Sequence, residues 1–342
     1  MNNLKSYNLI FFLLIVLLIG VLIFNLSFGS VSIPFSKIVA ILFGEEEVKD
    51  SWKTIILDYR IPKSITAILV GSGLSISGLL MQTLFRNPLA GPFVLGISSG
   101  ASLGVALLIL GTSLFGGLGF ISSSSFGIAI AASIGSLVIM STVMIVANSV
   151  RNTMSILIIG LMFGSITSAV ISILAYFSEP EQLQKFIFWG FGSLGNLSWN
   201  ELSIFSSFYL LSMSLLAFIL KPLNSLLIGE SYAMSMGVNI RFVRNIMLLI
   251  TSVLTGVITA FSGPIAFVGL AVPHIARLIF NTSNHTILLP ASAILGAMLM
   301  LIADTFAQLP TSQYTLPINA ITSLFGAPIV IWLLVRKKNL YL

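Results

Sequence analysis

Apolar residues run along this chain in ten stretches separated by short polar segments. The stretches cover residues 9–28, 62–84, 92–112, 124–148, 153–176, 199–220, 243–262, 265–280, 287–308 and 316–335. Most are about 20 residues long, which at a helical rise of about 1.5 Å per residue spans the roughly 30 Å hydrocarbon core of a bilayer. They lack the alternation of apolar and polar residues that a membrane-spanning β-strand requires. The pattern predicts an all-α polytopic membrane protein with about ten transmembrane helices.

The composition agrees with insertion in lipid, because 57% of the residues are hydrophobic and only 8% are charged. A water-soluble domain of 342 residues needs a broad polar surface, which this composition cannot supply. The first stretch is too long for the apolar region of a signal peptide and lacks a small-x-small cleavage site, so we interpret it as a retained helix. The two longest loops, residues 29–60 and 221–244, are too short to form a separate domain. We therefore expect a single transmembrane domain over residues 1–342.

Positive charge indicates how the chain is oriented in the membrane. If the N-terminus is cytoplasmic, ten basic residues fall on the cytoplasmic side and six on the outer side. The cytoplasmic set is Lys5, Arg86, Arg151, Lys221, Arg241, Arg244, Arg277, Arg336, Lys337 and Lys338, and the outer set is Lys37, Lys49, Lys53, Arg60, Lys63 and Lys185. Cytoplasmic loops are enriched in lysine and arginine, so both termini are predicted to be cytoplasmic. The net charge of +6 is then a topology signal and not evidence of nucleic-acid binding.

The residue inventory argues against catalysis by this chain. Cysteine is absent and His274 and His285 are the only histidines, so neither a thiolate site nor a histidine-based metal site is expected. No GxxxxGK[ST] phosphate-binding loop occurs, so any ATP hydrolysis that drives this protein must come from another chain. Two rival functions are weaker. An ion-coupled secondary transporter would need several buried ion-binding groups, and the spans offer little beyond Asp304. An intramembrane protease would need a Ser/His, HExxH or paired-aspartate arrangement, which the sequence does not show.

Small residues and prolines mark special places in the spans. A four-residue spacing relates Gly96, Gly100 and Gly104 in the third span and Gly160, Gly164 and Ser168 in the fifth. Such stripes let helix backbones approach closely, and the same faces can line a pathway because they leave room for a solute. Prolines bracket a short eighth span, and the run from Ser262–Gly263–Pro264 to Pro273–His274 predicts a broken segment packed inside the bundle.

A series of short motifs runs in order through most of the chain. Residues 60–63 (RIPK) precede Gly71, Gly73 and Gly78, and later segments read QTLFRNPLAGP (82–92), VLGISSGA (94–101), WGFGSL (189–194), GPIAFVGLAVPHIAR (263–277), LLP (288–290), AD (303–304) and GAP (326–328). Each motif is weak alone. In this order and spacing, the set resembles the FecCD-type permeases, the membrane subunits of ABC importers for iron–siderophore complexes, haem and cobalamin.

The resemblance implies a type II importer fold, with a ten-helix permease domain in the cytoplasmic membrane of a bacterium or archaeon. It implies a second permease subunit (a copy of this chain or a paralogue), two ATPase subunits that use ATP and Mg²⁺, and an extracytoplasmic solute-binding protein. No cofactor, metal or nucleic acid is expected to bind the chain itself. The expected solute is a metal chelate, with an iron–siderophore complex first, haem second and cobalamin third.

One inner loop has the features of a contact with an ATPase. Glu230 follows Gly229, a small residue (Ala233) comes three positions later, and Gly237 comes four beyond that. This spacing is similar to the E-A-A-x-x-x-G pattern that importer subunits present to their ATPases, and a short helix that ends at a glycine turn makes a rigid knob. Glu230 is the only acid that the predicted topology places inside. It would pair with a basic residue at this contact; the alternatives are a helix cap or a salt bridge within the loop.

Two cations lie one helical turn apart where the second span begins. In related permeases, basic residues at the positions of Arg60 and Lys63 engage acidic residues of the binding protein, so the resemblance implies a docking role. The alternative is interaction with lipid headgroups, which is common for cations at helix ends. The sequence departs from the family at Gln308, where an arginine is usual, and at residues 315–319, which read TLPIN in place of ELPxG.

Candidates for lining a pathway lie on the glycine-bearing faces of the third and fifth spans. They are Ser98, Ser99, Gly100, Ser165 and Ser168. Asp304, in the ninth span, is expected to make a structural hydrogen bond, because no series of acids or histidines accompanies it as a proton relay would require. His274 and Arg277 are expected to be packing or interface residues near the cytoplasmic end of the eighth span.

Overall fold

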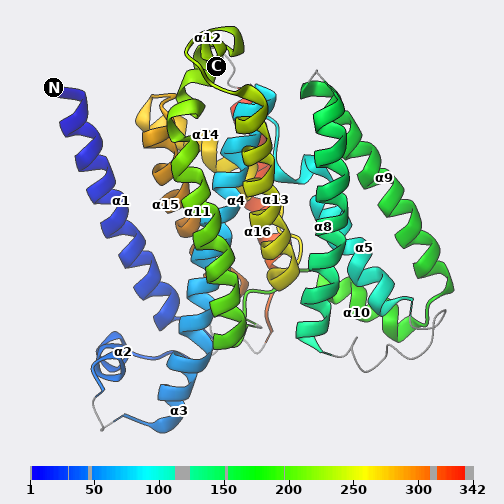
Figure 1. Ribbon diagram of the computed structural model, residues 1–342. Helices are drawn as coiled ribbons and strands as arrows, with labels where there is room; N and C mark the ends of the chain where they lie inside the picture. Colours follow the sequence, from blue (N-terminus) through cyan, green and yellow to red (C-terminus); the bar gives the residue numbers. More distant parts are fainter. Residues whose placement is uncertain are drawn as a thin grey trace.

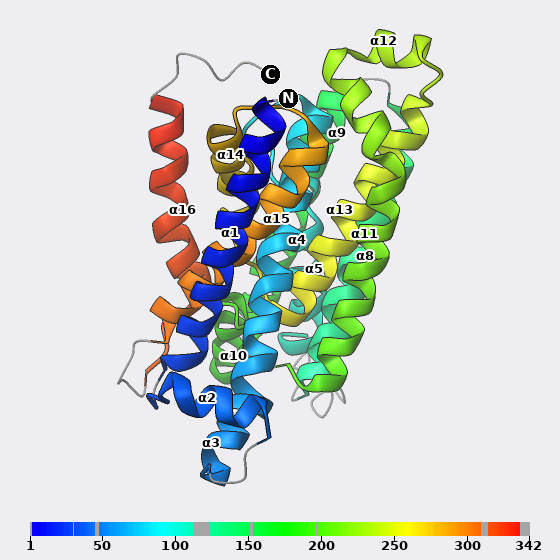
Figure 2. The ribbon, with the colours of Figure 1, turned by 90° about the vertical axis from the view of Figure 1, so that its left-hand side faces the viewer.

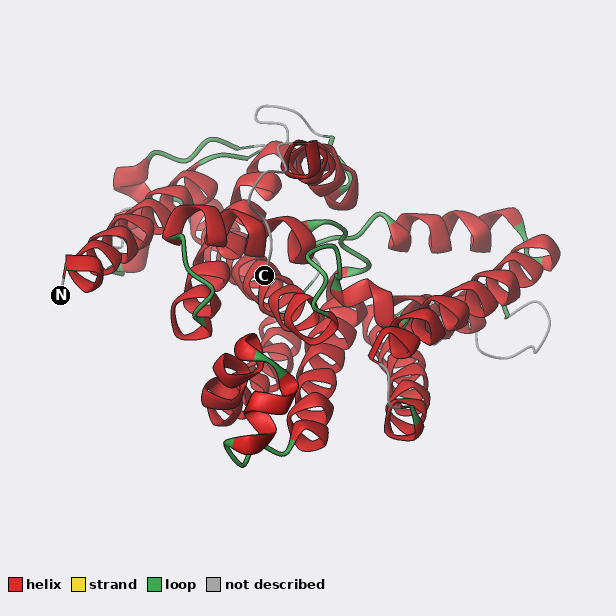
Figure 3. Ribbon diagram, turned by 90° about the horizontal axis from the view of Figure 1, so that it is seen from above, coloured by secondary structure: helices red, strands yellow, loops and turns green. Residues whose placement is uncertain are grey.

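The structure, a computed structural model, describes residues 2–29, 31–44, 48–111, 124–150, 153–195, 197–308 and 314–335. Within these residues all regular structure is helical, as predicted, and long helices form a bundle (Figures 1 and 3). A helix lies in each of the ten predicted spans. The ten are α1 (Asn2–Ser27), α4 (Ile61–Phe85), α5 (Ile97–Ile109), α8 (Ser125–Ser149), α9 (Thr153–Phe177), α11 (Trp199–Ile228), α13 (Ile240–Ser262), α14 (Val268–Phe280), α15 (His285–Ala307) and α16 (Ile318–Val335).

The helices differ in how far they can reach across a membrane. Among the described residues, seven helical segments are long and apolar enough to span a bilayer, whereas α5, α14 and α16 provide shorter apolar helices. One of the seven runs from Asp50 to Phe85, because α3 (Asp50–Thr54) and a π-helical segment (Ile55–Arg60) lead directly into α4. α11 continues to Ile228, about two turns beyond its expected end, and so reaches the inner loop.

α4 forms the centre of the bundle and packs against α11, α13, α14 and α15. Most of its side chains are buried, because small and apolar residues occupy every face of the helix. A methyl group added at Gly71 would lie 2.1 Å from the carbonyl oxygen of Gly296 in α15, and one at Gly78 would lie 1.6 Å from that of Gly269 in α14. Glycine at these positions therefore lets the helix backbones touch.

A second group of helices, α5, α8 and α9, packs together beside this core (Figure 1). A methyl group at Gly104 of α5 would lie 2.1 Å from the carbonyl oxygen of Ala131 in α8, and one at Gly100 would lie 2.6 Å from that of Gly135. The predicted close packing is confirmed for these two glycines. Gly96 differs, because it precedes α5 with a φ of 72°, a conformation that favours glycine.

The short helices lie at the two ends of the bundle. α12 (Glu230–Ser235) stands at one end, which we call the inner end (Figures 1 and 2). α2 (Phe35–Leu42), α3 and α10 (Pro180–Gly190) lie at the other, which we call the outer end. The start of α1 and the end of α16 share the inner end with α12 (Figure 2). The assignment of the inner end to the cytoplasm stays a prediction, based on the charge distribution.

The predicted break between the seventh and eighth spans is confirmed. α13 ends at Ser262, and the chain is irregular until α14 begins. The freed backbone groups find partners within the protein: the N–H of Ser193 donates to the carbonyl of Ser262 at 2.9 Å, and the N–H of Ala266 donates to the side-chain oxygen of Asn319 at 3.1 Å. Irregular backbone at membrane depth is stable only where such partners exist. No second break follows at Pro273, which lies inside α14.

Candidate functional site

α12 is a short helix that projects from the inner end of the bundle (Figure 1). It follows Gly229, which has a φ of 139°, and it ends at a turn in which Gly237 has a φ of 82°. At this turn the N–H of Gly237 donates to the carbonyl of Met234 at 2.9 Å, and the N–H of Val238 donates to that of Ala233 at 3.0 Å. These bonds form a Schellman motif, with Ala233 fully buried beneath it. The short helix and its glycine turn are present as predicted, while the contact with an ATPase stays a prediction.

The surface around α12 is strongly apolar for the end of a membrane bundle. The side chains that form it are each at least 49% exposed, and they are Ile228, Tyr232, Met234, Met236 and Phe242. A group of large exposed apolar side chains outside the lipid-facing region is typical of a protein-interaction site.

Glu230 occupies the first position of α12, and its side chain is exposed. It lines a small cavity together with Arg86, at the end of α4, and Arg244, in the first turns of α13. Cations of its own chain thus surround Glu230. This geometry favours the alternative of a local electrostatic role for Glu230 and leaves the apolar patch as the larger surface for a partner.

A buried polar chain connects the base of the α12 loop to the core of the bundle. His285, at the start of α15, is 1% exposed, and its Nε2 lies 2.8 Å from the hydroxyl of Thr83 in α4. The Nδ1 and the backbone N–H of His285 lie 3.1 and 2.8 Å from the side-chain oxygen of Asn224 in α11. Asn224 precedes α12 by less than two helical turns. The hydrogen bonds of Asn224, His285 and Thr83 therefore tie α11, α15 and α4 together near the base of the α12 loop. The sequence carries one signal that we did not use, an asparagine within a largely apolar helix.

His274 and Arg277 of α14 hold the last turn of α4 and the loop that follows it. The Nε2 of His274 lies 2.7 Å from the carbonyl oxygen of Pro88, and the Nη1 of Arg277 donates to the side-chain oxygen of Gln82 at 2.6 Å. The motif at residues 82–92 therefore packs against the motif that ends at Arg277. The packing interpretation of both residues is confirmed.

An open groove runs along α9 where this helix faces α5 and the 3₁₀ turn Pro92–Leu95. Its volume is about 500 Å³, and small residues form most of its wall. Three of the predicted pathway residues, Ser99, Ser165 and Ser168, line this groove together. Ser172 adds a fourth hydroxyl, which follows Ser168 after one helical turn and which the sequence analysis missed.

Ser98 and Gly100 do not line this groove, and their place in a pathway stays a prediction. Ser98 is 7% exposed, and its hydroxyl lies 3.2 Å from that of Thr259 in α13. Gly100 packs against Ile139 of α8. Neighbouring residues on a helix point about 100° apart. When Ser99 points toward α9, Ser98 and Gly100 therefore point elsewhere.

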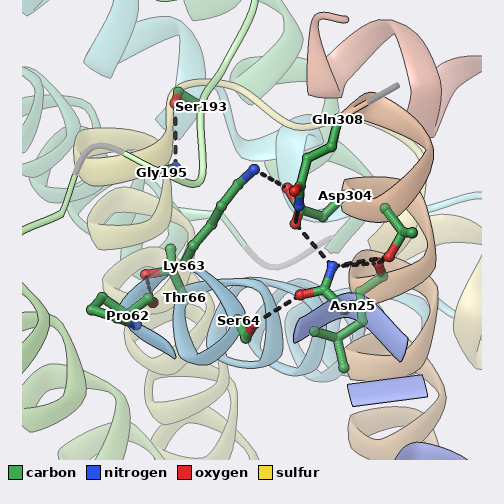
Figure 4. Close-up of polar contacts among 11 residues, drawn as sticks. Asn25, Pro62, Lys63, Ser64, Thr66, Ser193, Gly195, Asp304 and Gln308 are labelled. Carbon is green, nitrogen blue, oxygen red and sulfur yellow. Dashed lines mark hydrogen bonds and ion pairs between the residues drawn. The ribbon is translucent and has the colours of Figure 1, made fainter. Parts of the chain in front are cut away.

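At the outer end, a buried polar cluster joins α1, α4 and α15 (Figure 4). The carboxylate of Asp304 lies 2.9 Å from the Nζ of Lys63 and accepts hydrogen bonds from the side-chain amides of Asn25 at 3.0 Å and Gln308 at 2.6 Å. The hydroxyl of Ser64 donates to the side-chain oxygen of Asn25 at 2.7 Å. Asp304 is only 2% exposed, and each of its two carboxylate oxygens has a partner. Its predicted structural role is confirmed.

Arg60 and Lys63 both face their own chain. Arg60 is 8% exposed, and its guanidinium donates to the backbone carbonyls of Leu26, at 2.5 Å, and Val31, so it holds the chain that follows α1. The side chain of Lys63 is 23% exposed and is paired with Asp304. The docking role of the two cations stays a prediction, and it requires that Lys63 be shared between Asp304 and a partner or released from it.

Comparison with known proteins places this architecture among transport proteins. Residues 15–336 match the FecCD transport family. Over 340 residues the chain is 34% identical to the hemin transport system permease protein HmuU of Yersinia pestis, covering 99% of each protein. Over 284 residues it is 35% identical to the vitamin B12 import system permease protein BtuC of Salmonella paratyphi A, covering 82% of this chain and 83% of that protein. A solved inward-facing conformation of an ABC transporter assigned to the metal-chelate type matches with a TM-score of 0.83 at 29% identity, covering 96% of this chain and 99% of that one.

Proposed function

This chain belongs to the FecCD transport family, and we propose that it forms the gated pathway of a binding-protein-dependent importer for an iron–siderophore complex. Family membership makes it an integral permease subunit of an ABC importer in the cytoplasmic membrane. The proposal adds the solute, a second permease subunit, two ATPase chains that use ATP and Mg²⁺, and an extracytoplasmic binding protein. The chain itself then performs no covalent step, because nucleotide binding and hydrolysis elsewhere switch the pathway between outward- and inward-facing states.

The observation that carries the proposal is α12 with its apolar surface. The turn at Gly237 fixes the end of the helix, and the fully buried Ala233 anchors it on the bundle. A rigid projection transmits a displacement without bending, and the polar chain from Asn224 through His285 offers that displacement a route into α15 and α4. These features support the binding of an ATPase subunit at the inner end.

The chemistry of the groove along α9 supports a bulky, oxygen-rich solute. Four serine hydroxyls line it without adding charge; those of Ser165 and Ser172 donate to carbonyls of their own helix and can still accept hydrogen bonds from a solute. None of the ten described residues that line the groove is His, Cys, Met or Tyr, the side chains that ligate haem iron. This composition supports an iron–siderophore complex ahead of haem.

Haem is the second candidate solute, because the relative that matches this chain over 99% of its length is named for hemin transport. Cobalamin is the third, because the relative named for vitamin B12 import matches over 82% of the chain.

The test is transport by the reconstituted complex. Proteoliposomes that hold this chain with its ATPase, and that receive the binding protein from the opposite side, should accumulate a radioactive iron–siderophore only when ATP and Mg²⁺ are supplied. Parallel assays with haem and cobalamin identify the solute, and accumulation of haem without the siderophore would replace the first candidate by the second. Accumulation driven by an ion gradient with no nucleotide would overturn the importer mechanism itself.

A further inference from the structure

An apolar groove lies between α8, α11 and α13, and it shares no lining residue with the serine-lined groove along α9. Its volume is about 270 Å³. Large exposed side chains, among them Ile130, Ile134 and Phe208, form its rim. Small residues leave the space between them: Ser252 is buried in the wall, and a methyl group added at Gly256 would lie 3.2 Å from the side chain of Ser136. The result is a groove with an almost wholly apolar wall.

The position of this groove matches one leaflet of the membrane. Its lining residues occupy the outer parts of the three helices, from Phe126 to Met140, slightly past the middle of α8, and up to Phe261 near the end of α13. The segment from Phe126 to Met140 rises about 21 Å, somewhat more than the roughly 15 Å of one leaflet of hydrocarbon. The groove is therefore long enough for one acyl chain of the outer leaflet.

A second cavity, with a mostly apolar wall that carries the charged side chains of Lys185 and Glu201, adjoins the outer end of this groove. Its volume is about 420 Å³, and it shares Ala129 and Phe261 with the groove. Its wall adds Lys185, which is ion-paired with Glu181 at 2.9 Å, and Glu201, which accepts hydrogen bonds from Ser198.

Two aromatic residues mark the level of this cavity in the membrane. Trp189 lines the cavity, and the half-exposed Trp199 begins α11. Tryptophan is enriched where hydrocarbon meets headgroups. The apolar groove adjoins a cavity that holds charged side chains at this level, so apolar and charged groups follow each other in the same order as in a phospholipid.

We propose that this composite site binds one phospholipid of the outer leaflet, with an acyl chain in the groove and the phosphate beside Lys185. A peptide is a poor occupant, because the apolar wall would leave its backbone hydrogen-bonding groups unsatisfied. The bound acyl chain fills the space between α8 on one side and α11 and α13 on the other. It thereby holds the group α5, α8 and α9 against the core of the bundle. The inference depends on membrane insertion alone and not on the identity of the solute or of the ATPase.

The site is tested by native mass spectrometry of the purified full chain. After delipidation, palmitoyl-oleoyl phosphatidylethanolamine or phosphatidylglycerol is added back, and one lipid per chain should be retained. Ser133→Trp fills the groove from α8 and should lower retention by about tenfold or more, because each methylene excluded from an apolar site weakens binding several-fold. The matched control is Val138→Trp on the same helix, which is 58% exposed and lies outside the groove, and it should retain the lipid.

Further variants keep the test decisive. If Ser133→Trp does not yield folded protein, Ser252→Leu fills the groove from α13 and should lower retention in the same way. Lys185→Ala should weaken retention of both lipids, since both carry a phosphate. Absence of retained lipid in the unmodified chain, or equal retention by the Ser133→Trp and Val138→Trp variants, would overturn the site. Equal retention by Lys185→Ala would overturn the placement of the phosphate.

Discussion

Asp304 shows what one charged residue does inside this membrane protein. A carboxylate that is 2% exposed is stable only when its charge is compensated, and here Lys63 supplies the opposite charge while Asn25 and Gln308 supply hydrogen bonds. These residues come from α1, α4 and the end of α15, so the cluster fixes the outer ends of three helices. The glutamine at position 308 adds a donor without adding a second cation.

Breaking this pair from one side should destabilise the protein. Asp304→Asn should lower the free energy of unfolding by about 2–3 kcal/mol, because a buried cation loses its partner and Lys63 is only partly exposed to solvent. Lys63→Met should have a comparable cost. The double variant should cost less than the sum of the two, as thermal unfolding of the purified protein would measure. Strictly additive losses would show that the two residues do not stabilise each other.

The same double variant separates the structural role of Lys63 from a docking role. If Lys63 acts only through Asp304, the double variant should lose no more uptake than its loss of stability explains. If uptake stays low at saturating ATP and recovers only with excess binding protein, Lys63 contributes to docking.

At the scale of a single element, α12 owes its shape to its last turn. Gly237 has a φ of 82° and no atom within 4 Å of an added methyl group, so only the backbone conformation resists a side chain there. Helix ends of this kind depend on glycine, because the left-handed conformation costs other residues about 1–2 kcal/mol. The rigidity of the α12 projection therefore depends on one residue.

Gly237→Leu should weaken association with the ATPase and reduce uptake by roughly tenfold. This factor corresponds to the cost of about 1–2 kcal/mol for a left-handed conformation at a residue other than glycine. Gly44→Leu is a matched control, because Gly44 has a φ of 77°, likewise has no atom within 4 Å, and lies beside α2 at the outer end. It should bear a similar strain and leave ATPase binding intact. Pull-down of the ATPase and uptake measure both variants. Normal ATPase association of the Gly237→Leu protein would remove the coupling role of this turn.

At the scale of the whole molecule, the groove along α9 is incomplete. One of its sides is open, and α9 presents exposed apolar residues such as Ile158, Ile166 and Ile173 along its length. α9 also stands at the edge of the bundle (Figure 1). A pathway for a polar solute needs a closed wall, because lipid would otherwise fill it. A second permease subunit that packs along α9 would close it.

Because the chain has no cysteine, a single introduced thiol reports on this arrangement. If the second subunit is a copy of this chain, Ser168→Cys should cross-link between copies with a short bifunctional maleimide. Phe218 is 80% exposed on α11, a helix that lies away from α9 (Figure 1), so Phe218→Cys should not cross-link. Electrophoresis after treatment of intact membranes measures both variants. Failure of Ser168→Cys to cross-link would contradict a pair of identical subunits across this groove.

The sequence by itself determined the helices of the ten spans, because they depend on local properties, whereas the short helices α2, α3 and α10 were not predicted. Run length and hydropathy placed the ten helices, the proline and glycine after Ser262 placed the break, and the glycine at position 237 placed the end of α12. Ser99, Ser165 and Ser168 line one groove, since helical spacing brings small residues to one face, while their role in a pathway stays a prediction.

Only the tertiary structure decided which polar groups meet. Lys63 could face a partner protein, lipid headgroups or its own chain, and the packing of α4 against α15 turned it toward Asp304. Ser98 points into α13 and not into the groove, because the rotation of α5 is set by its glycine contacts with α8. Helical periodicity fixes which residues share a face, but the direction of that face depends on neighbours distant in sequence.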